Sequence, residues 1–228
     1  MYKFMKQKTQ KILTWVLVGT TILVIGGFAI RQFLGSRKRA KSKFKRNIID
    51  IANKEWEAWN KGKTKEKSSS MYSRLKQYWD SVGWDESRWT PSGVAWSSAF
   101  ISYVMKKGGA GKDFKYSASH SSYIRKARKN REEKNKNPFK AYRIDEKKPE
   151  LGDLVCYYRG TTSSDPFNRD SSYQSHCDIV VAKNKANIEV IGGNVSDTVG
   201  KKVVPLNDKG YVVKNSVGKK WFAIVKTK

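Results

Sequence analysis

The chain has few of the residues that build metal centres or supply imidazole bases. Its 228 residues include two cysteines and two histidines. No Cys-x-x-Cys pair and no cluster of His and Cys is present, so the sequence predicts neither a metal site nor a cofactor. Any imidazole base is therefore His120 or His176. Cys156 and Cys177 both lie in strand-like runs, and they form either one disulfide in an exporting compartment or two small buried thiols.

Acidic residues are also scarce, and the first 46 residues contain none. That segment carries 12 Lys and Arg, residues 47–228 carry 35 against 20 Asp and Glu, and the formal charge of the chain is +27. A positive potential of this size attracts polyanions such as nucleic acid, anionic lipid headgroups or acidic wall polymers. The charge therefore indicates partners rather than a fold.

Residues 12–30 form an uncharged, mostly apolar run. About 20 apolar residues span a bilayer as a helix. We therefore expect a basic N-terminal segment at 1–11, a transmembrane helix at 12–30 and a polybasic juxtamembrane tether at 31–46. The alternative is a cleaved signal peptide, with residues 27–29 (Gly-Phe-Ala) as the cleavage site.

Residues 47–228 are predicted to form one α+β domain. Segments with apolar residues at helical spacing precede strand-like runs, an order typical of helices packed on an antiparallel sheet. Helices are expected over 47–60, 71–82, 96–107 and 117–134. Strands are expected over 152–158, 176–182, 187–191, 201–205 and 220–226. The loop 159–175 leads into His176 and is long enough to line a cleft.

A small hydroxyl residue stands in the first turn of the helix predicted to start at Trp96. The N–H groups and dipole at a helix N-terminus favour negative charge. Ser97 is therefore a candidate nucleophile, provided that a base takes its proton. His176, at the start of an apolar strand, is the first candidate base. His120 lies at a predicted helix start, where capping is the simpler role, although it can still line the cleft.

Two groups are candidates for orienting the histidine. Asn194 follows a Gly-Gly turn, and Asp178 lies two residues after His176 on the same strand face. Asp178 either substitutes for Asn194 or only ends a hydrogen-bond network. The predicted catalytic set is Ser97, His176 and Asn194, and the further cleft candidates are Ser98, His120, Asp178, Gly192 and Gly193.

Five segments together resemble the bacterial and phage domain of unknown function numbered 2272. They are residues 96–105 (WSSAFISYVM), 119–124 (SHSSYI), 152–156 (GDLVC), 175–180 (SHCDIV) and 191–195 (IGGNV). That family resembles the CHAP and NlpC-type amidohydrolases of the papain-like superfamily. The resemblance implies a papain-like fold over roughly residues 47–228. It places Ser97 at the usual cysteine, His176 at the histidine, and Gly192, Gly193 and Asn194 at a Gly-Gly-Asn turn.

Three functions compete. The first is a membrane-anchored hydrolase: the resemblance implies cleavage of amide bonds of peptidoglycan, the run at 12–30 supplies the anchor, and the basic surface would concentrate the protein on anionic wall polymers. Serine in place of cysteine leaves a second hypothesis, a catalytically inactive module of the same fold that binds the wall or another polyanion. The third is a membrane-attached nucleic-acid-binding protein, which would use the charge and exposed aromatic side chains at Trp84, Trp89 and Tyr173.

The charge distribution and the expected activity favour opposite membrane orientations. The tether at 31–46 is more basic than residues 1–11, so the positive-inside rule favours a cytoplasmic domain. A wall-cleaving enzyme needs its domain on the periplasmic or wall side, and a large following domain can override the charge bias. We expect a single-pass membrane protein with its domain on the wall side, and a phage virion protein also fits the pattern.

Overall fold

The computed structural model describes residues 39–161 and 165–228. The chain divides into a unit over Met1–Lys43 and a compact unit over Phe44–Lys228, and strands β1 to β7 all belong to the second unit. The predicted basic segment at 1–11 and membrane helix at 12–30 lie outside the described residues. Within the described ranges, no helix is both long enough and apolar enough to cross a membrane.

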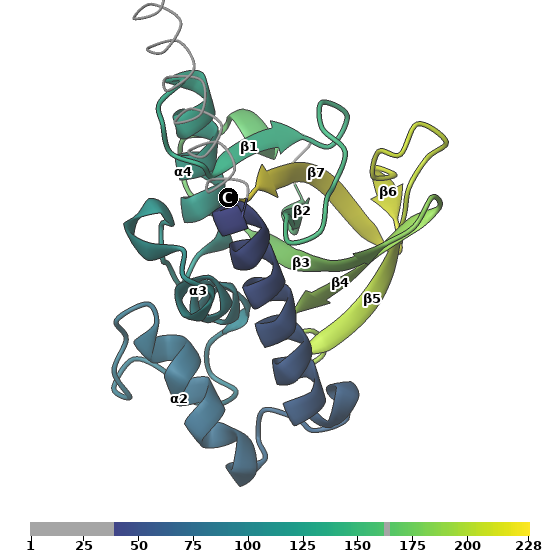
Figure 1. Ribbon diagram of the computed structural model, residues 1–228. Helices are drawn as coiled ribbons and strands as arrows, with labels where there is room; N and C mark the ends of the chain where they lie inside the picture. Colours follow the sequence, from purple (N-terminus) through teal and green to yellow (C-terminus); the bar gives the residue numbers. More distant parts are fainter. Residues whose placement is uncertain (1–38, 162–164) are drawn as a thin grey trace, which may run out of the picture. The chain divides into compact units, whose positions relative to one another are not determined.

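Helices come first in the chain and flank the sheet (Figure 1). The first is helical over residues 39–58. After it come η1 (Asn60–Gly62), η2 (Ser69–Met71), α2 (Tyr72–Asp80), α3 (Ser97–Gly108), η3 (Gly111–Asp113) and α4 (His120–Glu132). The first helix continues into the segment predicted as tether because Phe44, Ile48 and Ala52 form a buried stripe with a spacing of four.

The strands make one antiparallel sheet with the order β1-β7-β2-β3-β4-β5, and β6 pairs with β7. Their bounds are β1 (Lys140–Arg143), β2 (Leu154–Tyr158), β3 (Ser175–Lys183), β4 (Asn187–Gly192), β5 (Gly200–Pro205), β6 (Asn215–Ser216) and β7 (Lys219–Lys226); η4 (Pro166–Asn168) lies between β2 and β3. The α+β prediction is confirmed. The short strands β1 and β6 were not predicted.

Alternation along β3 divides its side chains between two apolar clusters. Cys177 and Ile179 belong to the cluster that contains the helix residues, and Val180 belongs to a second cluster on the other face of the sheet. Successive side chains of a strand point to opposite faces. His176 and Asp178 therefore point to the second face, while Cys177 lies under the helices.

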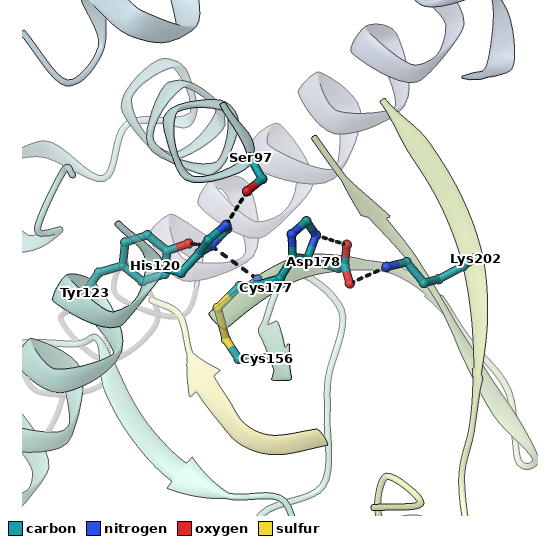
Figure 2. The surroundings of a disulfide bond; sticks show 8 residues. Ser97, His120, Tyr123, Cys156, Cys177, Asp178 and Lys202 are labelled. Carbon is teal, nitrogen blue, oxygen red and sulfur yellow. Dashed lines mark hydrogen bonds and ion pairs between the residues drawn. A yellow bond between two sulfur atoms is a disulfide. The ribbon is translucent and has the colours of Figure 1, made fainter. Parts of the chain in front are cut away.

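The two cysteines are joined by a disulfide. Cys156 on β2 lies opposite Cys177 on β3 in the antiparallel register, and the bond links these strands at the helix-covered face (Figure 2). The sequence alone had left this pairing open against two separate buried thiols.

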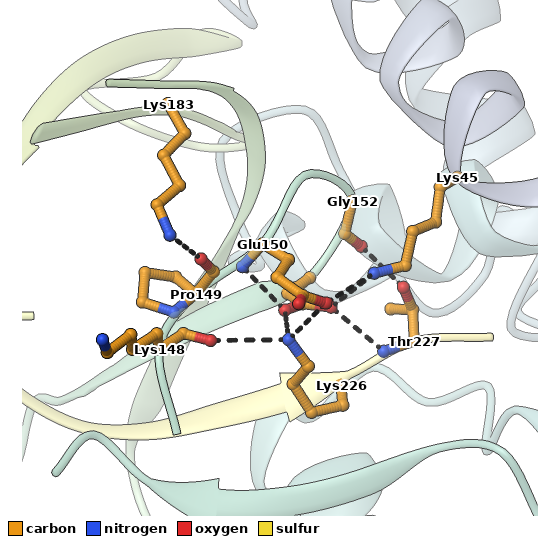
Figure 3. Close-up of polar contacts among 9 residues, drawn as sticks. Lys45, Lys148, Pro149, Glu150, Gly152, Lys183, Lys226 and Thr227 are labelled. Carbon is orange, nitrogen blue, oxygen red and sulfur yellow. Dashed lines mark hydrogen bonds and ion pairs between the residues drawn. The ribbon is translucent and has the colours of Figure 1, made fainter. Parts of the chain in front are cut away.

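A buried carboxylate fastens the first helix to the last strand. Asp153 is fully buried, and Oδ1 lies 3.2 Å from Nζ of Lys45 on the first helix, while Oδ2 is paired with Lys226 on β7. The N–H groups of Glu150 and Thr227 also donate to this carboxylate, at 2.9 and 3.3 Å. Figure 3 shows Lys45, Lys226 and Thr227 converging on this group of polar contacts. Two cations and two N–H donors compensate the buried charge.

Candidate functional site

Helix α3 begins at Ser97, and the residue before it is held by aromatic packing. The N-cap Trp96 makes no side-chain capping bond. Its ring stacks on Trp59 with centroids 5.0 Å apart, and its Nε1–H donates to Glu66 Oε2 at 2.7 Å. Within the described part of the chain, the N–H groups of Ser97 and Ser98 have no acceptor. The start of α3 therefore combines a fixed position with free backbone donors.

The Ser97 hydroxyl is bonded to His120. Ser97 Oγ lies 2.7 Å from His120 Nε2, and both side chains are nearly buried. His120 is the first residue of α4, whose N-cap Ser119 makes no side-chain capping bond. The predicted capping role of His120 is therefore wrong, because its imidazole is directed to α3 (Figure 2). The structure brings His120, rather than the predicted His176, to the candidate nucleophile.

The other ring nitrogen of His120 meets two donors. The Cys177 N–H donates to Nδ1 at 3.2 Å, and the Tyr123 hydroxyl is bonded to the same atom. A nitrogen that accepts an N–H bond carries no proton, so neutral His120 in this arrangement holds its proton on Nε2 and donates it to Ser97. Tyr123 was not among the site residues predicted from the sequence, although its i+3 spacing from His120 places it on the same helix face.

His176 belongs to a separate polar group on the second face of the sheet. Its Nε2 lies 3.0 Å from Asp178 Oδ1, and Lys202 Nζ lies 2.9 Å from Asp178 Oδ2. Arg159 Nη2 lies 3.1 Å from His176 Nδ1. Arginine only donates, so Nδ1 accepts and Nε2–H donates to Asp178. Both nitrogens of His176 are occupied, although its ring centroid is only 5.0 Å from that of His120.

The glycine turn lies against the His176–Asp178 pair and against Phe100 of α3, but its asparagine joins neither histidine. A Cβ on Gly192 would lie 2.0 Å from Asp178 Oδ1, and one on Gly193 would lie 2.5 Å from Phe100 Cβ. Asn194 has a positive φ of 52°. Among the described residues, its side chain makes no hydrogen bond to either histidine. Asp178, not Asn194, is therefore the group in contact with His176.

Ser98 takes a structural position. Its hydroxyl donates to the carbonyl of Ser117 at 2.7 Å, in the segment that leads to α4. The Ser102 hydroxyl donates to the same carbonyl at 3.2 Å. These bonds hold the start of α3 beside the start of α4, which is the condition for the contact between Ser97 and His120.

Burial keeps both imidazoles neutral. Desolvation, followed by the positive forms of His176 and Arg159, lowers the pKa of His120 well below its ordinary value, against an opposing effect of Asp178. Desolvation also lowers the pKa of His176, although Asp178 raises it. Desolvation acts to raise the pKa of the Asp178 carboxyl, but Lys202 and then His176 outweigh it and lower that pKa. The Asp178 carboxylate is therefore ionised between the neutral His176 ring and Lys202.

The lowered histidine pKa values predict a loss of stability in mild acid. Unfolding returns each histidine to a pKa of about 6.5. Below that pH the unfolded chain binds protons that the folded chain does not, so the free energy of unfolding should fall as the pH drops, by at most about 1.4 kcal/mol per pH unit for each histidine. The pKa of His120 is lowered further than that of His176, so His120 should contribute the larger part. Urea unfolding between pH 7 and 5 measures this slope. A His120→Asn chain should lose the larger part of it, and a stability unchanged over this range would contradict the assignment.

Two further features of the described residues concern metal binding and the aromatic side chains expected on a nucleic-acid-binding surface. They contain no group of three or more His, Cys, Asp and Glu that could hold a metal ion. Trp89 and Tyr173, expected to be exposed, are buried at 4% and 8% exposure. Both belong to the core cluster that includes the helices, and Trp84 packs against it. The Trp89 and Tyr173 rings are therefore not available for stacking on bases, while the Trp84 ring is partly exposed.

The family model described as "Uncharacterized protein conserved in bacteria (DUF2272)" matches residues 52–226. The chain belongs to this family. No curated protein and no solved structure matches the chain. The DUF2272 region contains the whole Ser97–His120 contact, the disulfide and the His176–Asp178 pair.

Proposed function

We propose that this DUF2272 domain is a serine-type amidohydrolase of papain-like fold, acting on peptide amide bonds of the cell wall. The observation that carries the proposal is the 2.7 Å contact between Ser97 Oγ and His120 Nε2 at the first residue of α3. A nucleophile within hydrogen-bond reach of an imidazole, at a helix start with free N–H groups, has the parts needed for acyl transfer.

The reaction proceeds in two steps. Ser97 Oγ attacks the amide carbon while its proton passes to His120 Nε2, and the carbonyl oxygen becomes an oxyanion near the free N–H groups of α3. His120 then protonates the leaving amine, and water hydrolyses the acyl-serine ester. Nε2 can accept the proton only in the other tautomer, with the imidazole proton on Nδ1. The proposal therefore requires that the bond from the Cys177 N–H to Nδ1 be given up in the substrate complex, with Tyr123, which also contacts Nδ1, then accepting the Nδ1–H bond.

The disulfide supports a location outside the cytoplasm. Disulfides persist in oxidising compartments and are rare in the cytosol, and Cys156 and Cys177 are joined. This favours the wall side over the cytoplasmic side that the positive-inside rule indicated. The formal charge of +27 suits a substrate embedded in anionic polymer. The membrane anchor at 12–30 remains part of the proposal.

Mass spectrometry of purified peptidoglycan incubated with the full-length protein tests the proposal. We expect new amide-cleavage fragments from the parent protein and at least about a 10³-fold loss of rate for Ser97→Ala. Ser73→Ala, which changes an exposed serine on α2, is the matched control and should retain the parent rate. Cleavage that persists in Ser97→Ala, or no fragments from any protein, would contradict the serine mechanism.

A second candidate function is a binding module without catalysis. It is favoured by the Cys177 N–H at 3.2 Å from His120 Nδ1, since this bond places the imidazole proton on Nε2 and makes Ser97 the acceptor. Fragments released by Ser97→Cys but not by the parent would support this candidate, because a thiol ionises more easily than a hydroxyl.

A further inference from the structure

Three cationic side chains surround one aromatic ring beside His176. The guanidinium carbon of Arg159 lies 5.6 Å from the centroid of Tyr157, and Nζ of Lys202 and of Lys219 each lie 5.2 Å from it. The same ring stacks on His176, with centroids 4.9 Å apart. The positive cluster is therefore adjacent to the imidazole that neighbours His120.

The sheet brings these cations together from three separate segments. Tyr157 on β2 lies opposite both His176 on β3 and Trp221 on β7. Lys219 precedes Trp221 by two residues, so the two side chains share a face of the sheet. The hairpin turn before it has positive φ at Val217 and Gly218, 48° and 67°, the pattern of a tight two-residue turn. That turn fixes the point at which Lys219 enters β7.

The charges of this cluster are not balanced. Asp178 is the buried carboxylate at this position, and it is paired with Lys202 at 2.9 Å. Within the described residues, neither Arg159 nor Lys219 has a carboxylate partner. Placing cations close together is unfavourable unless an anion lies between them. Arg159 is exposed and Lys219 half-buried, so solutes can reach both.

The guanidinium of Arg159 has N–H groups that its contacts with the described residues do not use. Its Nη2 is used by His176 Nδ1 at 3.1 Å and by the Tyr157 hydroxyl at 3.3 Å. The N–H groups of Nε and Nη1 have no acceptor among the described residues. A guanidinium held on one side and free on the other matches the planar geometry of a carboxylate.

We infer that Arg159 and Lys219 bind an oxyanion group of the substrate, a carboxylate of an acidic peptide, beside His176, whose ring lies next to that of His120. This inference rests on the proposed function and narrows its substrate to peptides with a free carboxylate near the bond that is cut. The two cations supply the affinity for the carboxylate. Inorganic phosphate is also an oxyanion that these cations can bind, so the test compares its binding with that of the peptide.

Isothermal titration calorimetry with the full-length Ser97→Ala protein measures binding without turnover. The probes are the tripeptide Ala-γ-Glu-Lys with free carboxylates, the same peptide with its carboxylates amidated, and inorganic phosphate. We expect the free peptide to bind at least about tenfold more tightly than the amidated one. Adding Arg159→Gln or Lys219→Gln should each weaken binding about tenfold, as expected for a hydrogen bond to a charged group. Lys185→Gln, an exposed lysine between β3 and β4, is the matched control and should have no effect.

Equal affinity for the free and amidated peptides would overturn the inference. Phosphate binding that is tighter than peptide binding and lost in Arg159→Gln would overturn the assignment to a peptide carboxylate. Binding does not depend on Ser97, so the two proposals fail separately. Carboxylate-selective binding without wall fragments would refute only the hydrolase, and wall fragments without carboxylate selectivity would refute only the anion site.

Discussion

Replacing His120 by glutamine should reduce the rate of peptidoglycan amide cleavage by about 10³-fold or more. Glutamine keeps a polar side chain near Ser97 but cannot accept and return a proton, and general base catalysis contributes about 10²–10⁴ in rate. The measurement is the initial rate of fragment release by the full-length protein. His120 lies 2.7 Å from Ser97 Oγ, so it is the imidazole that reaches this proton when its Nε2 is unprotonated.

The comparison variant is His176→Gln, which should cause a smaller loss. His176 is engaged by Arg159 and Asp178, not by Ser97. Thermal unfolding of both variants separates a lost base from a lost fold, because both rings are buried. A larger rate loss for His176→Gln at equal stability would restore His176 as the base and contradict the role given to His120.

Removing the disulfide should lower the free energy of unfolding by about 3 kcal/mol, because the bond restricts the unfolded chain. Cys156 and Cys177 are separated by 21 residues in sequence. For a domain of this size the change corresponds to a fall in melting temperature of roughly 10 °C. Urea unfolding of the Cys156→Ala/Cys177→Ala double variant against the oxidised parent measures it.

The reduced parent separates the loss of the bond from the loss of the sulfur atoms. Reduction should destabilise the parent and leave the double variant unchanged. Identical unfolding of the oxidised and reduced parent would contradict a stabilising role. The variant should also cleave more slowly, since the N–H of residue 177 is bonded to His120 and the bond fixes that segment.

The regular elements were largely predictable because their apolar spacing is strong. The helix predicted over 96–107 is observed at Ser97–Gly108, and the strand predicted over 220–226 is observed at Lys219–Lys226. Strand β1, Lys140–Arg143, was missed because four residues with two basic side chains carry no clear alternation. It is a strand only because it pairs with β7 at the sheet edge. The two-residue β6 likewise exists only through its hairpin.

The candidate site was predictable in its residue types but not in its pairing. Only two histidines exist, so both were candidates, and strand position favoured His176 over His120. The choice between the two histidines depends on how α4 packs beside α3, because this packing brings together Ser97 and His120, which are 23 residues apart in the sequence. Local pattern carries no information about such packing. Arg159 and Lys202 were missed for the same reason, because the pairing of the strands brings them to His176 and Asp178, with Arg159 one residue past β2 and Lys202 on β5.

The Asp153 carboxylate has a mechanical consequence. It joins Lys45, near the start of the compact unit, to Lys226 on β7. In the sheet order β7 lies between β1 and β2 rather than at an edge. A force applied to the chain before residue 44 is therefore transmitted through Asp153 to β7, an interior strand. The hydrogen bonds of β7 to its neighbours on both sides then resist that force. A domain tethered by its N-terminus to a moving surface would in this way resist unravelling from the end at which it is held.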